Sequence, residues 1–248
     1  MLSTHTGDYN IFIGQNAGDD IYHCIKSAKR TIKMVSPYIS PEYIDLLLDA
    51  TARGVRVLLL TGSDMANNVE KRGEIYKKII TQQQHLDAES QKRRKDWMLF
   101  SAILIFASIA AGLIGYSINQ NKLLWSFATT PIFWFFFNSV KQIRIFNYTY
   151  DTRFNFGVFI SPYDQKIDDN HFFIHSKLYV IDEEVAFVGS VNFTKVAFRY
   201  NYECCVKLND ELVISGISDE IDHLTRTEGI FYRDISEIGR IIYPEPPN

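Results

Sequence analysis

The chain has 248 residues and a formal net charge of −3, with 46% apolar and 22% charged residues. This composition is typical of a folded protein and excludes a wholly disordered chain, and the near-neutral charge excludes a basic footprint over the whole chain for nucleic acid. The three cysteines, two of them adjacent, do not suit a disulfide framework, so we expect a reducing compartment.

The N-terminal region alternates between segments of strand and helix character. Runs of apolar and β-branched residues predict strands at 10–14, 31–36 and 55–60. Helical spacing of apolar residues predicts one helix at 19–29 and a second that begins at Ser40-Pro41-Glu42 and stops at Gly54. This order predicts an α/β sheet, with residues 1–68 as the first part of its domain.

A polar segment without proline, from about residue 69 to residue 95, predicts a long helix. We expect this segment (69–96) to be a helical stalk that continues into the apolar segment after it, and a solvated linker is the alternative.

Two apolar segments without charge follow the stalk, at 97–118 and 123–140, joined by a short polar link. As helices they would be roughly 33 Å and 27 Å long at ~1.5 Å per residue, close to the thickness of a bilayer core. They predict a transmembrane helical hairpin within 97–142, and the alternative is a buried helical hairpin in a soluble core.

Basic residues flank the outer ends of this hairpin and predict its orientation. The flanks carry six, against Lys122 alone in the link: Lys92, Arg93, Arg94, Lys95, Lys141 and Arg144. The positive-inside rule then places both flanks and both termini in the cytoplasm, without a signal peptide. We expect an integral membrane protein of a bacterial inner membrane.

The region after the hairpin predicts the second part of the same domain, at 143–242, followed by a disordered tail at 243–248. Strand character is found at 142–150, 156–160, 177–181, 185–188 and 202–208, and helical character at 211–224. No internal repeat is found.

A cluster of polar residues follows in the second part. His175 and Lys177 are two residues apart, so on a strand they project from the same face. If the strands at 177–181 and 185–188 pair, Ser190 and Asn192 come close to them. An imidazole, a cation, a hydroxyl and an amide around one point suit a phosphate diester.

At these residues the chain resembles the phospholipase D superfamily. The fixed positions of that motif and both of its spacings are present: His175-x-Lys177, four residues, Asp182, six residues, Gly189-Ser190-x-Asn192. The resemblance covers about 10–65 and 143–224. It implies an α/β fold with a mixed, phospholipase D-like sheet flanked by helices, here interrupted by the transmembrane hairpin.

The resemblance also implies roles for the catalytic residues, and it implies no cofactor and no metal. His175 would attack phosphorus and form a phosphohistidine, while Lys177, Asn192 and Ser190 would hold the phosphate oxygens. Glu203 would fix the tautomer of a catalytic histidine. Asp182 would be structural rather than chemical. We interpret His171 as a bystander.

The chemistry needs two histidines, and the chain supplies one motif. The expected solution is a C2 homodimer in which both copies of His175 meet at the two-fold axis, along the membrane normal. The first hypothesis for the substrate is a phospholipid, cleaved by a membrane-anchored phosphodiesterase. The alternative is a membrane-tethered endonuclease acting on DNA or RNA, and a third possibility is an inactive scaffold that binds phosphate headgroups.

Overall fold

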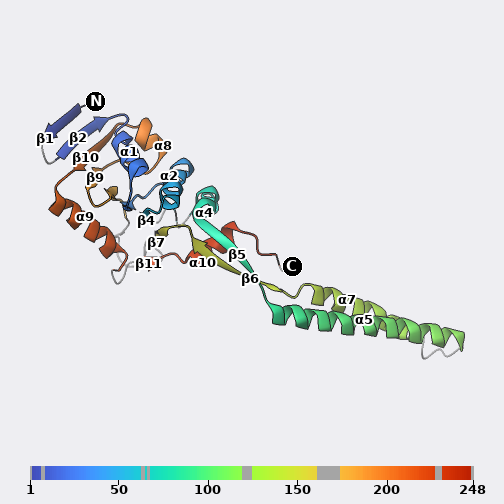
Figure 1. Ribbon diagram of the computed structural model, residues 1–248. Coiled ribbons are helices and arrows are strands. Elements are labelled where there is room, and N and C mark those ends of the chain that lie inside the picture. The colour runs from blue at the N-terminus through green and yellow to red at the C-terminus, as the bar shows by residue number, and fades with distance from the viewer. Residues whose placement is uncertain are drawn as a thin grey trace, which may run out of the picture. The chain divides into compact units, whose positions relative to one another are not determined.

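The computed structural model describes residues 2–6, 9–62, 65, 68–118, 125–160, 174–226 and 231–246, with the backbone alone at 2–6 and 231. The chain divides into two compact units (Figure 1). The first unit joins Met1–Thr81 to Tyr150–Tyr243, and the second, here called the hairpin unit, joins Gln82–Thr149 to Pro244–Asn248.

The described residues of the first unit form a mixed sheet with the strand order β1-β2-β10-β9-β8-β3-β4-β7-β11. Its strands are β1 (Leu2–Thr6), β2 (Tyr9–Gly14), β3 (Thr31–Val35), β4 (Arg56–Thr61), β7 (Asn155–Ile160), β8 (Leu178–Ile181), β9 (Val185–Gly189), β10 (Glu203–Leu208) and β11 (Phe231–Tyr232). β3, β4 and β7 are parallel, and the remaining neighbours pair antiparallel. The mixed α/β sheet predicted from the sequence is therefore present.

Helices pack on both faces of the sheet, because alternate strand residues point to opposite faces. Met34, Leu59 and Tyr179 pack with the helices of one face, while Val35 and Leu60 pack with α9 on the other. The helices of this unit are α1 (Asp19–Ser27), α2 (Pro41–Ala52), α4 (Gly73–Ile79), α8 (Lys195–Arg199), α9 (Glu211–Leu224) and α10 (Ile235–Ile242).

The predicted helical stalk at 69–96 is wrong as one continuous helix, although residues 88–96 are helical and continue into the apolar segment as predicted. α4 ends at Ile79, and β5 (Ile80–Leu86) follows it and pairs with β6 (Phe146–Thr152) in a separate two-stranded sheet. The β-branched run Ile79-Ile80-Thr81 favours a strand over a helix. A separate helix begins at Ala88. Its start is capped by the Asp87 carboxylate, which accepts the N–H groups of Glu89 and Ser90, each at 3.1 Å.

The hairpin unit contains α5 (Ala88–Ser117) and α7 (Ser126–Lys141), which pack against each other. The Ser108 hydroxyl lies 2.9 Å from the hydroxyl of Thr129. A Cβ atom on Gly112 would lie 2.6 Å from the Phe127 ring, so the close approach of the two helices requires glycine there. Within the described part of α5, the buried residues are the small ones: Ser101, Ser108, Gly112 and Gly115.

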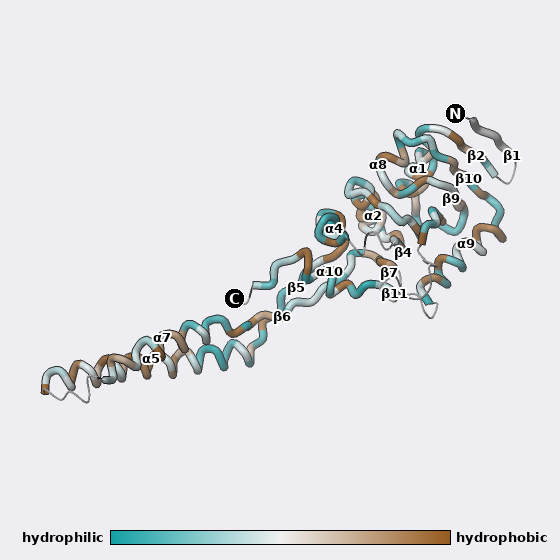
Figure 2. The backbone as a smooth tube through the Cα atoms, turned by 180° about the vertical axis from the view of Figure 1, so that it is seen from behind, coloured by the Kyte–Doolittle hydropathy of each residue, from teal (hydrophilic) through white to brown (hydrophobic). Residues whose placement is uncertain are grey.

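The apolar side chains of the hairpin unit mostly face outward. Leu99, Phe106 and Phe135 are 64%, 76% and 75% exposed, and Figure 2 shows apolar residues along both helices after a hydrophilic start of α5. Among the described residues, α5 alone is long and apolar enough to cross a membrane, since α7 has only 16 residues. The link at 119–122 lies outside the described residues, and the second span stays a prediction.

The predicted disorder of the tail is wrong for its first residues. In the hairpin unit, the Pro244 carbonyl accepts a hydrogen bond from Gln82 at 3.2 Å, Glu245 pairs with Arg144, and the Pro246 carbonyl accepts one from Tyr148 at 2.8 Å. Residues 247–248 lie outside the described residues.

Candidate active site

The candidate site residues gather at the edge of the sheet where β3 ends. Antiparallel pairing sets Leu178 opposite Val35 and Val188, and Gly189 opposite Cys205. The start of β8, the end of β9 and the start of β10 therefore meet at this edge. The pairing of the strands at 177–181 and 185–188, expected from the sequence, is confirmed.

His175 and Lys177 stand together just before β8. The Lys177 ammonium lies 3.2 Å from His175 Nε2 and 2.6 Å from the His175 carbonyl oxygen. Lys177 is only 6% exposed, whereas His175 is exposed. Because an ammonium can only donate hydrogen bonds, Nε2 faces it with its lone pair and the ring proton belongs on Nδ1. In this tautomer the lone pair that can act as a nucleophile is on Nε2, next to the Lys177 ammonium.

The Lys177 side chain carries an incompletely solvated charge. Burial lowers its pKa, and the negative charge of Glu203 opposes that shift only in part. A bound anion next to the ammonium would offset the same desolvation, so this position favours an anionic ligand.

Ser190 and Glu203 are bonded to each other rather than left open. The Ser190 hydroxyl donates to Glu203 and accepts the Cys204 N–H at 3.0 Å, and Asn201 donates to the second carboxylate oxygen at 3.0 Å. In this structure Ser190 is bonded to the carboxylate of Glu203, and the phosphate-holding role expected for it stays a prediction. Asn201 lies outside the motif, and its position two residues before Glu203 is the signal in the sequence that could indicate this role.

Gly189 permits the close approach of β9 and β10 beneath Ser190. A Cβ atom at this position would lie 2.9 Å from Cys205 Cα and would collide with the Cys204 carbonyl. That carbonyl also accepts the Ser190 N–H at 2.9 Å. The glycine of the motif is therefore needed to bring Ser190 to Glu203.

Asn192 presents an amide whose partner is missing. Its Oδ1 atom is buried and has no hydrogen-bond partner among the residues that the structure describes. An unpaired buried polar atom costs about 1–3 kcal/mol, and the amide oxygen and nitrogen can exchange places by a flip of the group. This amide is therefore suited to a ligand that supplies the missing bond.

Two serines and a tyrosine hold the loop that carries Asn192. The Phe193 N–H donates to Ser36 Oγ at 2.8 Å, and the Lys195 N–H donates to Ser40 Oγ at 2.8 Å. The buried Tyr179 hydroxyl donates to the Val191 carbonyl at 2.7 Å. These bonds tie the loop after β9 to the loop after β3, a positioning role that the sequence did not reveal.

Asp182 lies at the other end of β8, away from His175. Its carboxylate accepts the N–H groups of Lys29, Arg30 and Thr31 at 2.9, 2.7 and 2.9 Å. Burial alone would raise the pKa of Asp182, but these backbone hydrogen bonds lower it overall. The contacts give Asp182 a structural position at the start of β3.

Replacing Asp182 with asparagine is expected to lower the free energy of unfolding by about 1–3 kcal/mol at neutral pH, because an amide accepts through one atom only. The folded pKa of Asp182 lies below the unfolded one, so its stabilisation is present above about pH 4 and is lost as the pH falls through the folded pKa. Thermal unfolding of Asp182→Asn at pH 7 and in acid measures this difference. The exposed Asp219→Asn serves as control, and equal melting of both variants would contradict the structural role.

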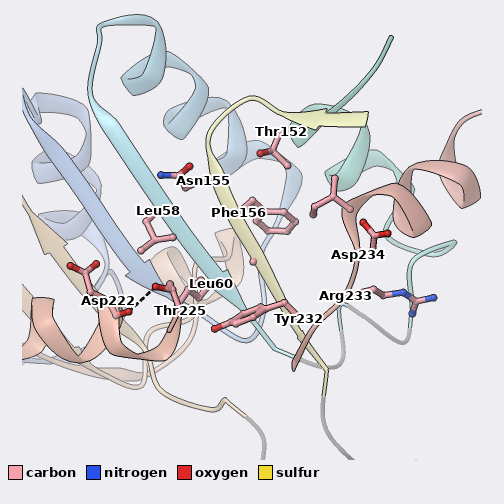
Figure 3. A pocket seen from close by; sticks show the side chains of 12 residues that line it. Leu58, Leu60, Thr152, Asn155, Phe156, Asp222, Thr225, Tyr232, Arg233 and Asp234 are labelled. Atoms are coloured by element: carbon pink, nitrogen blue, oxygen red, sulfur yellow. Dashed lines mark hydrogen bonds between the residues drawn. The ribbon is translucent and has the colours of Figure 1, made fainter. Parts of the chain in front are cut away.

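Two cavities lie away from the His175–Lys177 pair. One of about 640 Å³ lies beside β4, β7 and the end of α9 and is lined by residues such as Leu58, Phe156 and Tyr232 (Figure 3). A second of about 410 Å³ is lined by Gly14, Gln15, Asn16, Tyr200 and Tyr202. Gly14 pairs with Glu203, so of these two cavities the second lies beside the Glu203 part of the candidate site.

His171, interpreted as a bystander, lies outside the described residues, so its role stays a prediction. Among the described residues, no group of three or more His, Cys, Asp and Glu side chains is arranged to hold a metal ion.

Several solved structures resemble this chain. NucT from Helicobacter pylori matches with a TM-score of 0.50 at 13% identity, over 91% of this chain and 98% of that one. Nuc from Salmonella typhimurium, a phospholipase D family member, matches with a TM-score of 0.45 at 13% identity, over 91% and 99%. Phosphatidylserine synthase from Haemophilus influenzae matches with a TM-score of 0.45 at 12% identity, over 96% and 43%. The first likeness supports the fold alone.

No curated protein matches the sequence. A family model described as "Cardiolipin synthase, PLD-like domain" matches residues 21–100 and 138–225 and leaves out the middle of the hairpin. Its second segment contains all the candidate site residues. Because the matched segments cover more than half of the chain, and the sheet has the corresponding fold, the chain belongs to this family of PLD-like domains.

Proposed function

We propose that the protein hydrolyses phosphodiester bonds of phospholipids through a phosphohistidine at a site shared by two copies of the chain. The observation that carries the proposal is the pairing of Nε2 of the exposed residue His175 with the ammonium of the buried residue Lys177 at 3.2 Å. It combines a nucleophile and an anion-binding group at one point, as attack on a phosphodiester requires.

In the first step, His175 Nε2 attacks phosphorus and the bond from phosphorus to the leaving oxygen breaks. Lys177 and Asn192 hold the phosphate oxygens as negative charge accumulates on them. The leaving oxygen takes a proton from His175 of the partner subunit, which acts as the general acid.

In the second step, water attacks the phosphohistidine and the bond between phosphorus and nitrogen breaks. His175 of the partner subunit, now neutral, accepts the proton of this water and returns to its initial state. One motif per chain therefore suffices, provided that two chains form a C2 homodimer. The carboxylate of Glu203 accepts hydrogen bonds from Ser190 and Asn201. In this proposal it fixes the tautomer of a catalytic imidazole.

Exposed aromatic residues at the site's edge of the sheet support a lipid substrate. Tyr38, Tyr200 and Tyr202 are 40%, 60% and 76% exposed and lie in the loops that follow β3 and precede β10. Tyrosine has an apolar ring and a polar tip, which suits the boundary between headgroups and acyl chains. The outward-facing apolar side chains of α5 and α7 support insertion of the hairpin unit into a membrane. The basic residues at the outer ends of the hairpin favour a cytoplasmic position for both flanks.

The alternative is a membrane-tethered endonuclease with the same catalytic residues. The exposed tyrosines also suit this function, because the bases of a single strand stack on aromatic side chains. An inactive scaffold that binds phosphate headgroups is the third possibility, and the intact motif argues against it.

The substrate is tested with the purified full chain and a His175→Ala control. Each is incubated with vesicles of labelled cardiolipin or phosphatidylglycerol, and separately with single-stranded DNA and RNA. We expect release of the lipid headgroup by the unaltered chain alone. Cleavage of nucleic acid alone would reject the lipid substrate in favour of the endonuclease, and cleavage of neither would reject both.

Activity is expected to fall at high pH, and the Lys177 contribution to this fall should occur at a lower pH than the titration of an ordinary lysine. Lys177 binds the anion when protonated, and its lowered pKa means that the charge is lost below the usual value of about 10.4. The profile of kcat/KM, which reports the free enzyme, should therefore show an alkaline limb below that value, in addition to the fall caused by proton loss from the general acid.

Lys177→Arg should lower the rate but remove this limb, because a guanidinium stays charged. The measurement is kcat/KM between about pH 7 and 10.5, for the unaltered chain and for Lys177→Arg. Lys195→Arg, which alters an exposed lysine of α8, should keep the original limb. The same limb in Lys177→Arg would assign the titration to another group.

A further inference from the structure

Asn192 lies between two peptide groups that are each bonded to a buried hydroxyl group. The Tyr179 hydroxyl donates to the Val191 carbonyl at 2.7 Å, which fixes the peptide group before Asn192. The Phe193 N–H donates to Ser36 Oγ at 2.8 Å, which fixes the peptide group after it. Because the two soft backbone dihedrals of a residue lie between its flanking peptide groups, these bonds also fix the backbone of Asn192.

The two hydroxyl groups are themselves held in place by the core. Tyr179 and Ser36 are almost completely buried, and the Tyr179 ring packs edge-on against Phe198. The Ser36 hydroxyl also donates to the Tyr38 carbonyl at 2.7 Å. Burial raises the pKa of Tyr179 well above its ordinary value, so its hydroxyl remains protonated and donates throughout the pH range of an assay.

Tyr179 joins the loop of Asn192 to the strand that follows the buried ammonium. It lies in β8, two residues after Lys177. The same short segment therefore carries the Lys177 ammonium and the hydroxyl that holds the Val191 carbonyl. In the proposed function Lys177 and Asn192 hold oxygens of one phosphate, so the distance between their side chains has to match that group.

We propose that Tyr179 and Ser36 are positioning residues, which hold the Asn192 amide at the distance from Lys177 that the phosphate of the transition state requires. Both are buried, so they act through Asn192 and not on the substrate. A displacement of about 1 Å at a reacting centre can lower a rate roughly 100-fold. The inference rests on the proposed roles of Lys177 and Asn192, but not on whether the diester is a lipid or a nucleic acid.

Tyr179→Phe removes the hydroxyl and keeps the ring, and Tyr76→Phe is its matched control. Tyr76 of α4 is also fully buried, and its hydroxyl donates to the Met65 carbonyl at 2.8 Å. The same substitution therefore removes the same kind of hydrogen bond in another part of the core. The two variants should melt at similar temperatures, so a difference in activity between them reports the position of the bond.

The measurement is hydrolysis of phosphatidylglycerol in mixed micelles by the full chain, with single-stranded DNA or RNA in its place if the substrate test selects nucleic acid. We expect Tyr179→Phe to lower kcat about tenfold with little change in KM, because Asn192 binds charge that develops in the transition state. Tyr76→Phe should leave both constants as they are.

A double-mutant cycle separates positioning of Asn192 from a general effect on the fold. Asn192→Ala removes the amide and should lower kcat by about 100-fold. In that background Tyr179→Phe and Ser36→Ala should each cause no further loss, because no amide is left to position. Residues with independent structural roles would instead multiply the losses.

Equal effects of Tyr179→Phe and Tyr76→Phe, or multiplied losses in the Asn192→Ala background, would overturn the inference while leaving the proposed chemistry in place. Ser36→Ala tests the bond on the other side of Asn192, so the cycle can be completed even if Tyr179→Phe does not fold. Absence of turnover by the unaltered chain on all of these diesters would overturn the proposed function and this inference with it, so the two kinds of failure are distinguishable.

Discussion

Replacing His175 with alanine is expected to lower kcat for phosphodiester hydrolysis by at least about 10⁴-fold, because the variant lacks both the nucleophile and the proton carrier. His175 is an exposed residue, and its Nε2 atom faces the Lys177 ammonium. Alanine leaves the binding groups Lys177 and Asn192 in place. Binding of the intact substrate should therefore survive the loss of turnover.

The same variant tests the covalent intermediate. Brief exposure of the unaltered chain to a substrate labelled in its phosphate should leave an acid-labile label on the protein, as a phosphohistidine requires, and His175→Ala should carry none. His23→Ala, an exposed histidine of α1, is the control and should keep full activity. Substantial turnover by His175→Ala would reject the proposed nucleophile.

The central residues of the candidate site could be predicted from the sequence because they lie close together in the chain. Two strands joined by a tight turn must pair antiparallel, so the spacing from Lys177 to Asn192 was enough to bring the two loops together. The turn itself places Asp182 and Glu183 at a φ of 55° each, which closes the hairpin without a glycine.

Other features could not be predicted, because they depend on contacts between distant segments. The bonds from Ser36 and Ser40 to the loop after β9 join residues about 155 positions apart. β5 was mistaken for helix because its glutamine-rich sequence has no strand periodicity, and its pairing with β6 decides the conformation. The sequence analysis predicts no helix at α10. The apolar residues of this helix are buried because they pack on the core of the first unit, which is built from distant parts of the chain.

A heterodimer of one unaltered chain and one His175→Ala chain is expected to have less than about 1% of the activity of the unaltered dimer. If each site needs one imidazole from each subunit, the heterodimer has a nucleophile without its general acid, or the reverse. If each chain worked alone, the heterodimer would keep about half of the activity. The two mechanisms thus differ by well over an order of magnitude in one measurement.

Chains carrying two different affinity tags can be co-expressed and purified in two steps, so that only mixed dimers remain. A doubly tagged dimer of two unaltered chains controls for damage by the tags, and a mixed dimer with His23→Ala controls for an altered histidine outside the site. Half activity in the His175→Ala heterodimer would reject the shared site. It would also require a second imidazole within one chain, for which His171 would then be the first residue to replace, because it lies four positions before His175 in the same sequence.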